Sequence, residues 1–240
     1  MSDRPPPHGP SEPTESSRPR ISWRKLALEA FVLVVSVYVA IVLEGLSAER
    51  TQHREAVQAL EALRTELDLD RRDVEVILAA QRDRDLRHRR IDRWLSDVAA
   101  APTDSLSADF RALFSVNRTM FPRSASWTTM VASAQLSDLD DPLLVSRLAD
   151  FYENRNARLE YNGVVYDDWV TDLARLAVPE VWDQSSGQFL TRDPTETARL
   201  RGRLVGLHDL ALGFIGLLEE WQGALDSLIV DVDAYLSTAP

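Results

Sequence analysis

One apolar stretch near the start of the chain constrains the fold most, because the eighteen residues from Leu26 to Leu43 carry a single charge, on Glu29. As a helix this stretch is about 27 Å long, close to the hydrocarbon thickness of a bilayer. Basic residues crowd its N-terminal flank, namely Arg18, Arg20, Arg24 and Lys25. The pattern predicts a transmembrane helix over residues 23–46 whose N-terminus is cytoplasmic, since basic flanks stay on that side.

The regions on either side of this helix differ in composition. Residues 1–22 are rich in Pro and Ser, which predicts a disordered cytoplasmic tail. Residues 47–240 are long enough for one extracytoplasmic domain with a hydrophobic core. A cleaved signal peptide is the alternative interpretation, because small residues follow the apolar core at Gly45 and Ser47. The long polar lead-in favours a retained anchor.

Charge and cysteine content limit the partners and the chemistry of this domain. From Ser47 onward the chain has 22 basic and 33 acidic residues. Such a surface repels phosphate, so we expect no nucleic-acid partner. The sequence has no cysteine, which excludes disulfides, a thiolate nucleophile and Cys-ligated metals.

Helical periodicity dominates the first part of the domain. No Gly or Pro occurs between Leu46 and Ala101, and apolar residues recur at spacings of three, four and seven, at Ala56, Leu60, Leu63, Leu67, Val74 and Ile77. This predicts a long helix that continues from the membrane segment. The polar stretch Gln81–Arg90 interrupts the apolar stripe, and there we expect solvent exposure or a bend.

Local start and stop signals place the remaining helices. Pro102 ends the first helix, and shorter helices are predicted over residues 103–117 and 126–134. Asp141-Pro142 and Asp193-Pro194 each combine an N-cap residue with proline at the first helical position. They predict helices over residues 142–176 and 194–236. Pro179 ends the first of these, and Gly163 is a candidate kink within it. No run alternates long enough to predict a strand, so the fold class is all-α, a long-helix bundle with short connecting helices.

Two regions carry a family resemblance. In the first, an apolar helix contains a Glu, a Gly seven residues on, an Ala between apolar residues and a closing Glu-Glu-Arg. Glu29, Ala40, Glu49 and Arg50 are in register with this pattern, whereas Ser36 replaces the Gly and residues 44–47 replace a polar Asn-Asn-Trp-Asn. The second region comprises Trp127–Leu136, Asp141–Leu144 and the aromatic pair Phe151-Tyr152.

With these motifs the chain resembles an uncharacterised family of bacterial single-pass membrane proteins that share a domain of unknown function. The motifs cover about half of the chain. The resemblance implies a membrane anchor and a helical fold, and it supplies no activity or catalytic residue to transfer.

Glu29 is the one residue whose position suggests chemistry, because a carboxylate inside the membrane is costly and often marks a proton or ion pathway. A plainer interpretation places it near the cytoplasmic interface, where it reaches headgroups or pairs with Lys25. Pairing of helices in an oligomer is the third alternative.

Five glycines of the last predicted helix lie along one stripe, Gly202, Gly206, Gly213, Gly216 and Gly223. Glycine costs up to about 1 kcal/mol per site in a helix, so the stripe predicts close approach of another helix; the alternative is coincidence in an Ala/Gly/Leu-rich segment. The same helix contains an apolar stretch, Leu204–Leu218, that could form a second membrane span, although His208 and Asp209 lie within it.

The sequence nominates no catalytic or metal site. It lacks the nucleophile-elbow, P-loop and dinucleotide motifs. The four histidines, His8, His53, His88 and His208, have no ligand spacing, and Asp141 is better explained as a helix cap than as a calcium ligand with Asp138 and Asp140. Asp167 and Asp168 point about 100° apart on a helix, so they are not expected to form an acid/base pair. We therefore expect no enzyme activity and no cofactor.

The favoured hypothesis is a membrane-anchored helical interaction or scaffold protein of the bacterial cell envelope. Its expected partners are the lipid bilayer and either another protein or a second copy of the chain. The alternative is an accessory subunit of a membrane transport or sensing complex, with Glu29 in a helix interface.

Overall fold

The computed structural model describes residues 23–97, 103–115 and 119–238. It divides into two units, Met1–Arg50 and Thr51–Pro240. Within the described residues the fold is all-α, as predicted, with one pair of two-residue strands. The predicted tail, residues 1–22, lies outside the described part of the chain.

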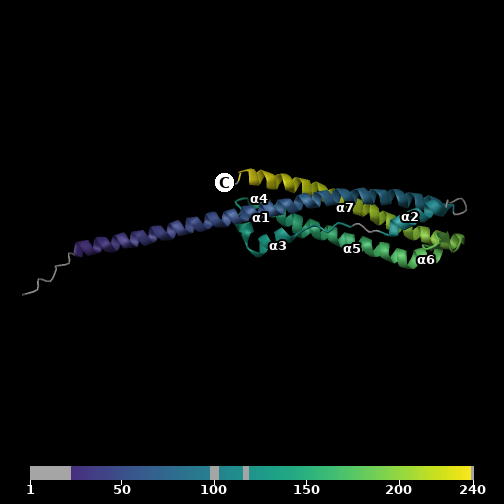
Figure 1. Cartoon of the computed structure of the whole chain (residues 1–240), viewed down its shortest axis with the longest axis horizontal. Coiled ribbons are helices and arrows are strands. Elements are labelled where there is room, and N and C mark those ends of the chain that lie inside the picture. The colour runs from purple at the N-terminus through teal and green to yellow at the C-terminus, as the bar shows by residue number, and fades with distance from the viewer. Residues whose placement is uncertain (1–22, 98–102, 116–118, 239–240) are drawn as a thin grey trace, which may run out of the picture. The chain divides into compact units, whose positions relative to one another are not determined.

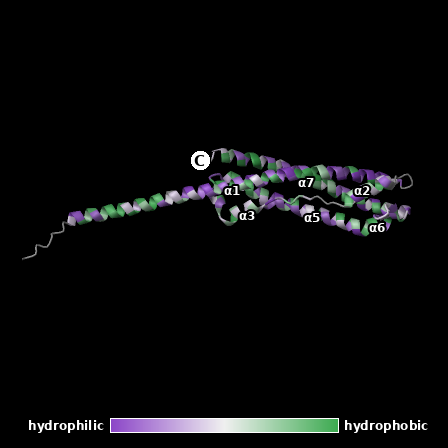
Figure 2. Cartoon of the chain, viewed as in Figure 1, coloured by the Kyte–Doolittle hydropathy of each residue, from purple (hydrophilic) through white to green (hydrophobic). Residues whose placement is uncertain are grey.

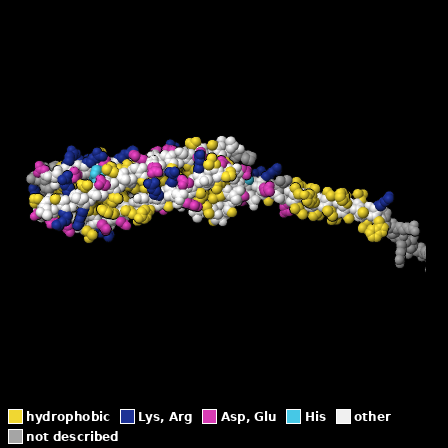
Figure 3. Space-filling model, turned by 180° about the vertical axis from the view of Figure 1, so that it is seen from behind, with side chains coloured by type: hydrophobic (Ala, Val, Ile, Leu, Met, Phe, Trp, Pro, Cys, Tyr) yellow, Lys and Arg dark blue, Asp and Glu magenta, His cyan; other side chains and the backbone are white. Residues whose placement is uncertain are grey.

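The first unit contains the N-terminal part of helix α1 (Trp23–Ser96). Its ribbon is mostly hydrophobic (Figure 2), and hydrophobic side chains dominate the face seen in the space-filling view (Figure 3). Among the described residues α1 is the one helix long and apolar enough to cross a membrane, and none of its most apolar window is buried. These properties are compatible with a membrane location.

The second unit is a bundle in which α1 from Thr51 onward, α5 and α7 lie side by side (Figure 1). In sequence, the middle part of this unit is one uninterrupted helical run, and its C-terminal part is one long helix. The run comprises α4 (Pro142–Ala149), the π turn η2 (Asp150–Arg155), α5 (Asn156–Asp172), the π turn η3 (Leu173–Ala177) and α6 (Val178–Val181). The other helices are α7 (Pro194–Thr238), α2 (Thr103–Ser115), α3 (Ala125–Ala132) and the 3₁₀ turn η1 (Gln135–Asp138).

Both predicted Asp-Pro helix starts are confirmed. The Asp141 carboxylate accepts hydrogen bonds from the backbone N–H groups of Leu143 and Leu144, at 2.9 and 3.0 Å. Asp193 caps α7 in the same way, and accepts from Thr195 at 2.7 Å. In each case proline at the first helical position has no N–H to leave unpaired, so local chemistry alone specifies the start.

The predicted end before Pro179 is wrong, because the run continues through Pro179 to Val181. Proline removes one N–H donor and crowds the carbonyl four residues earlier. The π turn η3 ends at Ala177, directly before this point, and its wider hydrogen-bond spacing replaces the regular ladder there. Gly163 lies inside the uninterrupted α5 and packs on Thr119, so the irregularities of the run are η2 and η3 rather than a kink at Gly163.

Two short strands, β1 (Trp182–Asp183) and β2 (Gln188–Phe189), pair antiparallel where no strand was predicted. Gly187 completes their turn with a φ of 70°, a left-handed conformation that favours glycine. The hairpin places the fully buried Trp182 against Phe110 of α2, with ring centroids 5.4 Å apart. Strands of two residues are too short to produce a period-two pattern in the sequence.

The apolar part of α7 belongs to the core of the bundle. Within Leu204–Leu218 the inward side chains are buried, namely Leu204, Leu207, Ala211, Phe214 and Leu218. Their burial accounts for the hydropathy of this stretch, and α7 does not qualify as a candidate membrane span within the described residues.

The expectation that the interrupted stripe at Gln81–Arg90 is exposed to solvent is wrong for its inward face. Helix α1 is unbroken across this stretch, and Gln81, Arg84 and His88 are buried. The apolar stripe is interrupted because polar side chains, rather than solvent, occupy the inward face of α1 there.

Candidate functional site

Three polar side chains of α1 enter the bundle core, and they are the start of the candidate site. Gln81, Arg84 and His88 are 0%, 4% and 3% exposed. They follow Leu78 and precede Ile91 at helical spacing, so they continue the inward face of α1. A buried guanidinium costs several kcal/mol unless its donors find partners, so the surrounding contacts determine what this site does.

Tyr166 of α5 is a hydrogen-bond partner of Arg84. Arg84 Nε donates a hydrogen bond to the Tyr166 hydroxyl at 3.2 Å, and the guanidinium carbon lies 5.7 Å from the ring centroid. The hydroxyl donates onward to Gln81 Oε1 at 3.4 Å. Burial raises the pKa of Tyr166, against a lowering influence of Arg84, so the hydroxyl stays protonated at neutral pH and remains a donor.

His88 meets His208 of α7 one turn further along α1. The two rings are stacked, with centroids 5.0 Å apart and an interplanar angle of 14°. Nε2 of His208 lies 2.6 Å from a carboxylate oxygen of Asp85. Burial lowers the pKa of His88 to about 3, with smaller contributions from His208 and Arg84, so His88 is uncharged at neutral pH. We call Gln81, Arg84, His88, Tyr166 and His208 the polar layer.

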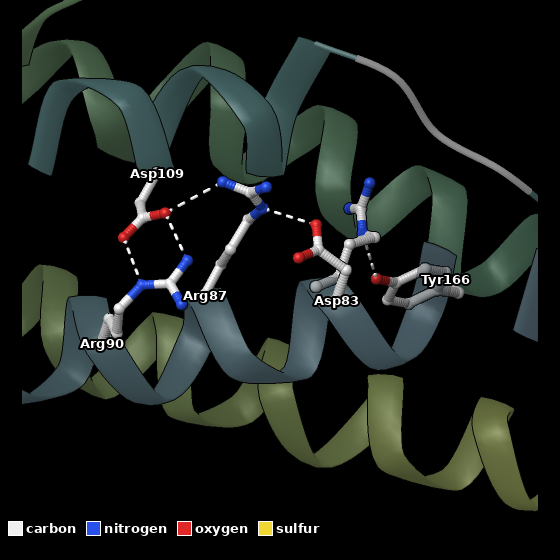
Figure 4. A network of polar contacts seen from close by, with 6 residues as sticks. Asp83, Arg87, Arg90, Asp109 and Tyr166 are labelled. Carbon is white, nitrogen blue, oxygen red and sulfur yellow. Dashed lines mark hydrogen bonds and ion pairs between the residues drawn. The ribbon is translucent and has the colours of Figure 1, made fainter. Parts of the chain in front are cut away.

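A charged network borders the polar layer and ties α2 to α1 (Figure 4). Asp109 of α2 is 4% exposed and accepts hydrogen bonds from Arg87 at 3.0 Å and from Arg90 at 2.7 and 2.8 Å. Arg87 also donates to Asp83 at 2.8 Å. The buried carboxylate is thus balanced by two guanidinium groups, which makes it the electrostatic anchor of α2.

The geometry of the polar layer favours alignment of helices. Gln81, Arg84, His88 and Tyr166 are each less than 5% exposed, so a soluble substrate has no direct access to them. Across the described residues no three His, Asp or Glu side chains are placed to hold a metal ion. Buried polar groups that hydrogen-bond from one helix to another, as Arg84 and Tyr166 do, fix how helices align.

The aromatic residues of the second resemblance region form a separate cluster. Trp127 of α3 stacks on Tyr152 with centroids 5.1 Å apart, and Phe151 contacts Trp221 of α7 at 5.3 Å. The Trp221 ring N–H donates to Asn156 at 2.8 Å. These residues join α3, η2 and α7, so the motif serves packing of the bundle.

The residues predicted as interface candidates do not form one site. Glu29 is exposed on the first-unit part of α1. Gly206 faces Trp169 of α5, whose ring would lie 3.8 Å from an added Cβ. The other stripe glycines have open space at that position, namely Gly202, Gly213, Gly216 and Gly223. No helix of the described chain packs closely on these four positions, and approach by another molecule stays a prediction.

The acidic residues considered as ligands or catalysts are explained by local contacts. Asp141 caps α4, as predicted. Asp167 accepts a hydrogen bond from Thr119 at 2.9 Å, and burial raises its pKa, whereas Asp168 is exposed. His53 contacts the backbone carbonyl of Asp138 at 3.0 Å. His8 lies outside the described residues.

A surface depression between α5 and α7 was not predicted from the sequence. It has a volume of about 380 Å³ and is lined by Trp169, Asp172, Leu173, Leu176, Ala177 and Arg203. We call it the α5–α7 groove. Trp169 and Leu176 are 49% and 64% exposed, although both are large apolar residues. Their spacing of seven residues was the available signal, but it is typical of any amphipathic helix.

Comparison with known proteins gives one result. Neither curated proteins nor solved structures match the chain. A family model does match, over residues 29–178, which include Glu29, the polar layer of α1 and α5, and the aromatic residues Trp127, Phe151 and Tyr152. Since this match covers more than half of the sequence, the chain belongs to DUF6090, a family of unknown function.

Proposed function

We propose that this protein is a single-pass membrane protein of the bacterial cell envelope that acts by binding another protein. Residues 23–46 are its anchor, residues 1–22 are cytoplasmic and residues 47–240 are extracytoplasmic. The apolar, exposed first-unit part of α1 and its basic N-terminal flank support this arrangement.

The observation that carries the binding role is the α5–α7 groove. An exposed tryptophan and an exposed leucine border it, and Arg203 lies on its α7 side. Partly exposed Trp and Arg side chains around a depression are the residues that contribute most to protein interfaces. The groove accommodates an apolar side chain of a partner between Trp169 and Leu176.

Charge favours a different protein over a second copy as the occupant. From Ser47 onward the chain carries a net charge of −11, so two such domains repel each other. A partner with a basic surface is attracted by the negative charge of this domain, and its apolar contact residue fills the groove.

Cross-linking in intact cells tests this proposal. A photoreactive amino acid replacing Leu176 should give an adduct with another protein, because that side chain borders the groove. Adding Trp169→Ala should abolish this adduct, since the groove loses one wall. Both variants should keep the fold, because Leu176 is mostly exposed and Trp169 is half exposed.

Val230 provides the matched control, because it is 65% exposed and also lies on a bundle helix. The same photoreactive residue there should give no such adduct. An adduct of twice the chain mass would instead show that the partner is a second copy. The groove assignment is contradicted if Leu176 yields no adduct, or if positions 176 and 230 yield the same one.

Topology is tested separately with reporter fusions. Alkaline phosphatase, which is active only outside the cytoplasm, should be active when fused after Pro240 and inactive when inserted after Ser17 with the rest of the chain following it. Activity at Ser17 with none at Pro240 would reverse the orientation. Activity at both sites would indicate that the apolar segment does not retain the N-terminus inside.

A further inference from the structure

The stacked histidines of the polar layer share one carboxylate, Asp85, which also has other partners. His208 lies 2.6 Å from Asp85, and Asp85 is also paired with Arg89 at 3.0 Å. Nε2 of His88 is buried and has no hydrogen-bond partner among the described residues. Asp85 is therefore hydrogen-bonded to other groups. Asp92, which acts on His208, is paired with Arg201 at 2.7 Å, and His88 faces the second imidazole.

The titratable groups around the His88–His208 stack and its neighbour Arg84 come from α1, α5 and α7. Helix α1 contributes Arg84 and Asp85, and α7 contributes His208. Helix α5 contributes the neutral Tyr166 and, next to Arg84, Asp167. Burial acts to raise the pKa of Asp85, but hydrogen bonds from His208 and Arg89 outweigh it and hold that pKa below its usual value. Asp85 thus remains ionised and paired with His208 and Arg89.

We propose that the His88–His208 stack is an acid-sensitive latch between α1 and α7. While His88 is neutral, the two rings pack and hold the helices together. A proton on His88 adds a buried positive charge beside Arg84, where the carboxylates of Asp85 and Asp92 are already paired with Arg89 and Arg201, and this favours separation of α1 and α7 at this level. This inference does not depend on the proposed binding partner.

The direction of the pH effect follows from linkage. In the closed latch the pKa of His88 is about 3, whereas in an opened, hydrated state it returns toward 6.5. The opened state therefore binds the proton more tightly, and opening becomes more favourable as the pH falls from about 6.5 toward 3. Between about pH 7.5 and 5.5 the opened population should rise about ten-fold.

Hydrogen exchange of the full chain in lipid nanodiscs measures this opening. Protection factors, corrected for the intrinsic exchange rate at each pH, should fall about ten-fold for peptides covering Leu204–Ala211 between about pH 7.5 and 5.5. His88→Leu should remove this pH dependence, because it fills the site without a titrating group. His53→Gln is the matched control at a distant histidine and should keep the response of the parent.

A direct titration keeps the proposal testable if His88→Leu fails to fold. In the parent protein the imidazole NMR signals of His88 should remain those of a neutral ring at about pH 5.5. Three results would each overturn the latch. The His88 signal could titrate at the ordinary pKa of histidine, the parent could show no loss of protection, or His88→Leu could show the same loss as the parent.

Discussion

Trp221→Ala should lower the free energy of unfolding of the bundle by about 3 to 5 kcal/mol. Trp221 is 2% exposed, and its ring packs on Phe151 with centroids 5.3 Å apart. Truncation leaves a large cavity between α7 and η2. It also removes the donor to Asn156, which is itself only 4% exposed, so a buried amide oxygen loses its partner. Urea unfolding followed by circular dichroism at 222 nm measures the change.

Trp169→Ala is the control for this prediction, since it is the same substitution at a side chain that is 49% exposed. It should cost less than about 1 kcal/mol, because surface substitutions away from buried contacts have small effects. Similar losses for both variants would mean that burial of the Trp221 ring does not stabilise the bundle. A folded Trp169→Ala variant also validates its use in the cross-linking experiment.

The elements that the sequence predicted well depend on neighbouring residues only. Asp141-Pro142 and Asp193-Pro194 specify helix starts because the cap and the helix lie within four residues of each other. The inward stripe of α1 was visible for the same reason, since its spacing follows from the helix period. These signals suffice for the all-α fold and for most helix boundaries.

The polar layer escaped prediction because its partners are distant in sequence. Arg84 and Tyr166 are 82 residues apart, so nothing near Arg84 shows that its charge is accommodated. In the sequence alone, a polar residue at an inward position looks like an interruption of the apolar stripe of α1. The available signal was the unbroken spacing, in which Gln81, Arg84 and His88 continue from Leu78 to Ile91 on one face.

The helix end at Pro179 and the α5–α7 groove escaped prediction for other reasons. Proline ends a regular α-helix, but the π turn η3 changes the hydrogen-bond pattern just before Pro179. The groove depends on which face of α5 and η3 is left uncovered by α7. Helix periodicity shows that α5 has an apolar face, but it does not show which helix covers that face. Such features require the assembled bundle.

Asp109→Ala should destabilise the bundle by about 2 to 3 kcal/mol. Its carboxylate is 4% exposed and receives three hydrogen bonds from Arg87 and Arg90. Hydrogen bonds to charged groups contribute more than neutral ones, and the substitution leaves two guanidinium groups without their shared counter-ion. Arg87 retains Asp83, and both arginines are partly exposed, so the loss stays below that of a fully buried pair.

Glu196→Ala is the matched control, because Glu196 forms an ion pair with Arg199 at 2.9 Å in which both side chains are exposed. Its removal should change the free energy of unfolding by less than about 0.5 kcal/mol, since water and salt already screen such pairs. Hydrogen exchange adds a positional test, because Asp109→Ala should reduce the protection of α2 more than that of α5. Equal effects of the two substitutions, or a loss of protection spread evenly over the bundle, would mean that Asp109 does not anchor α2 to α1.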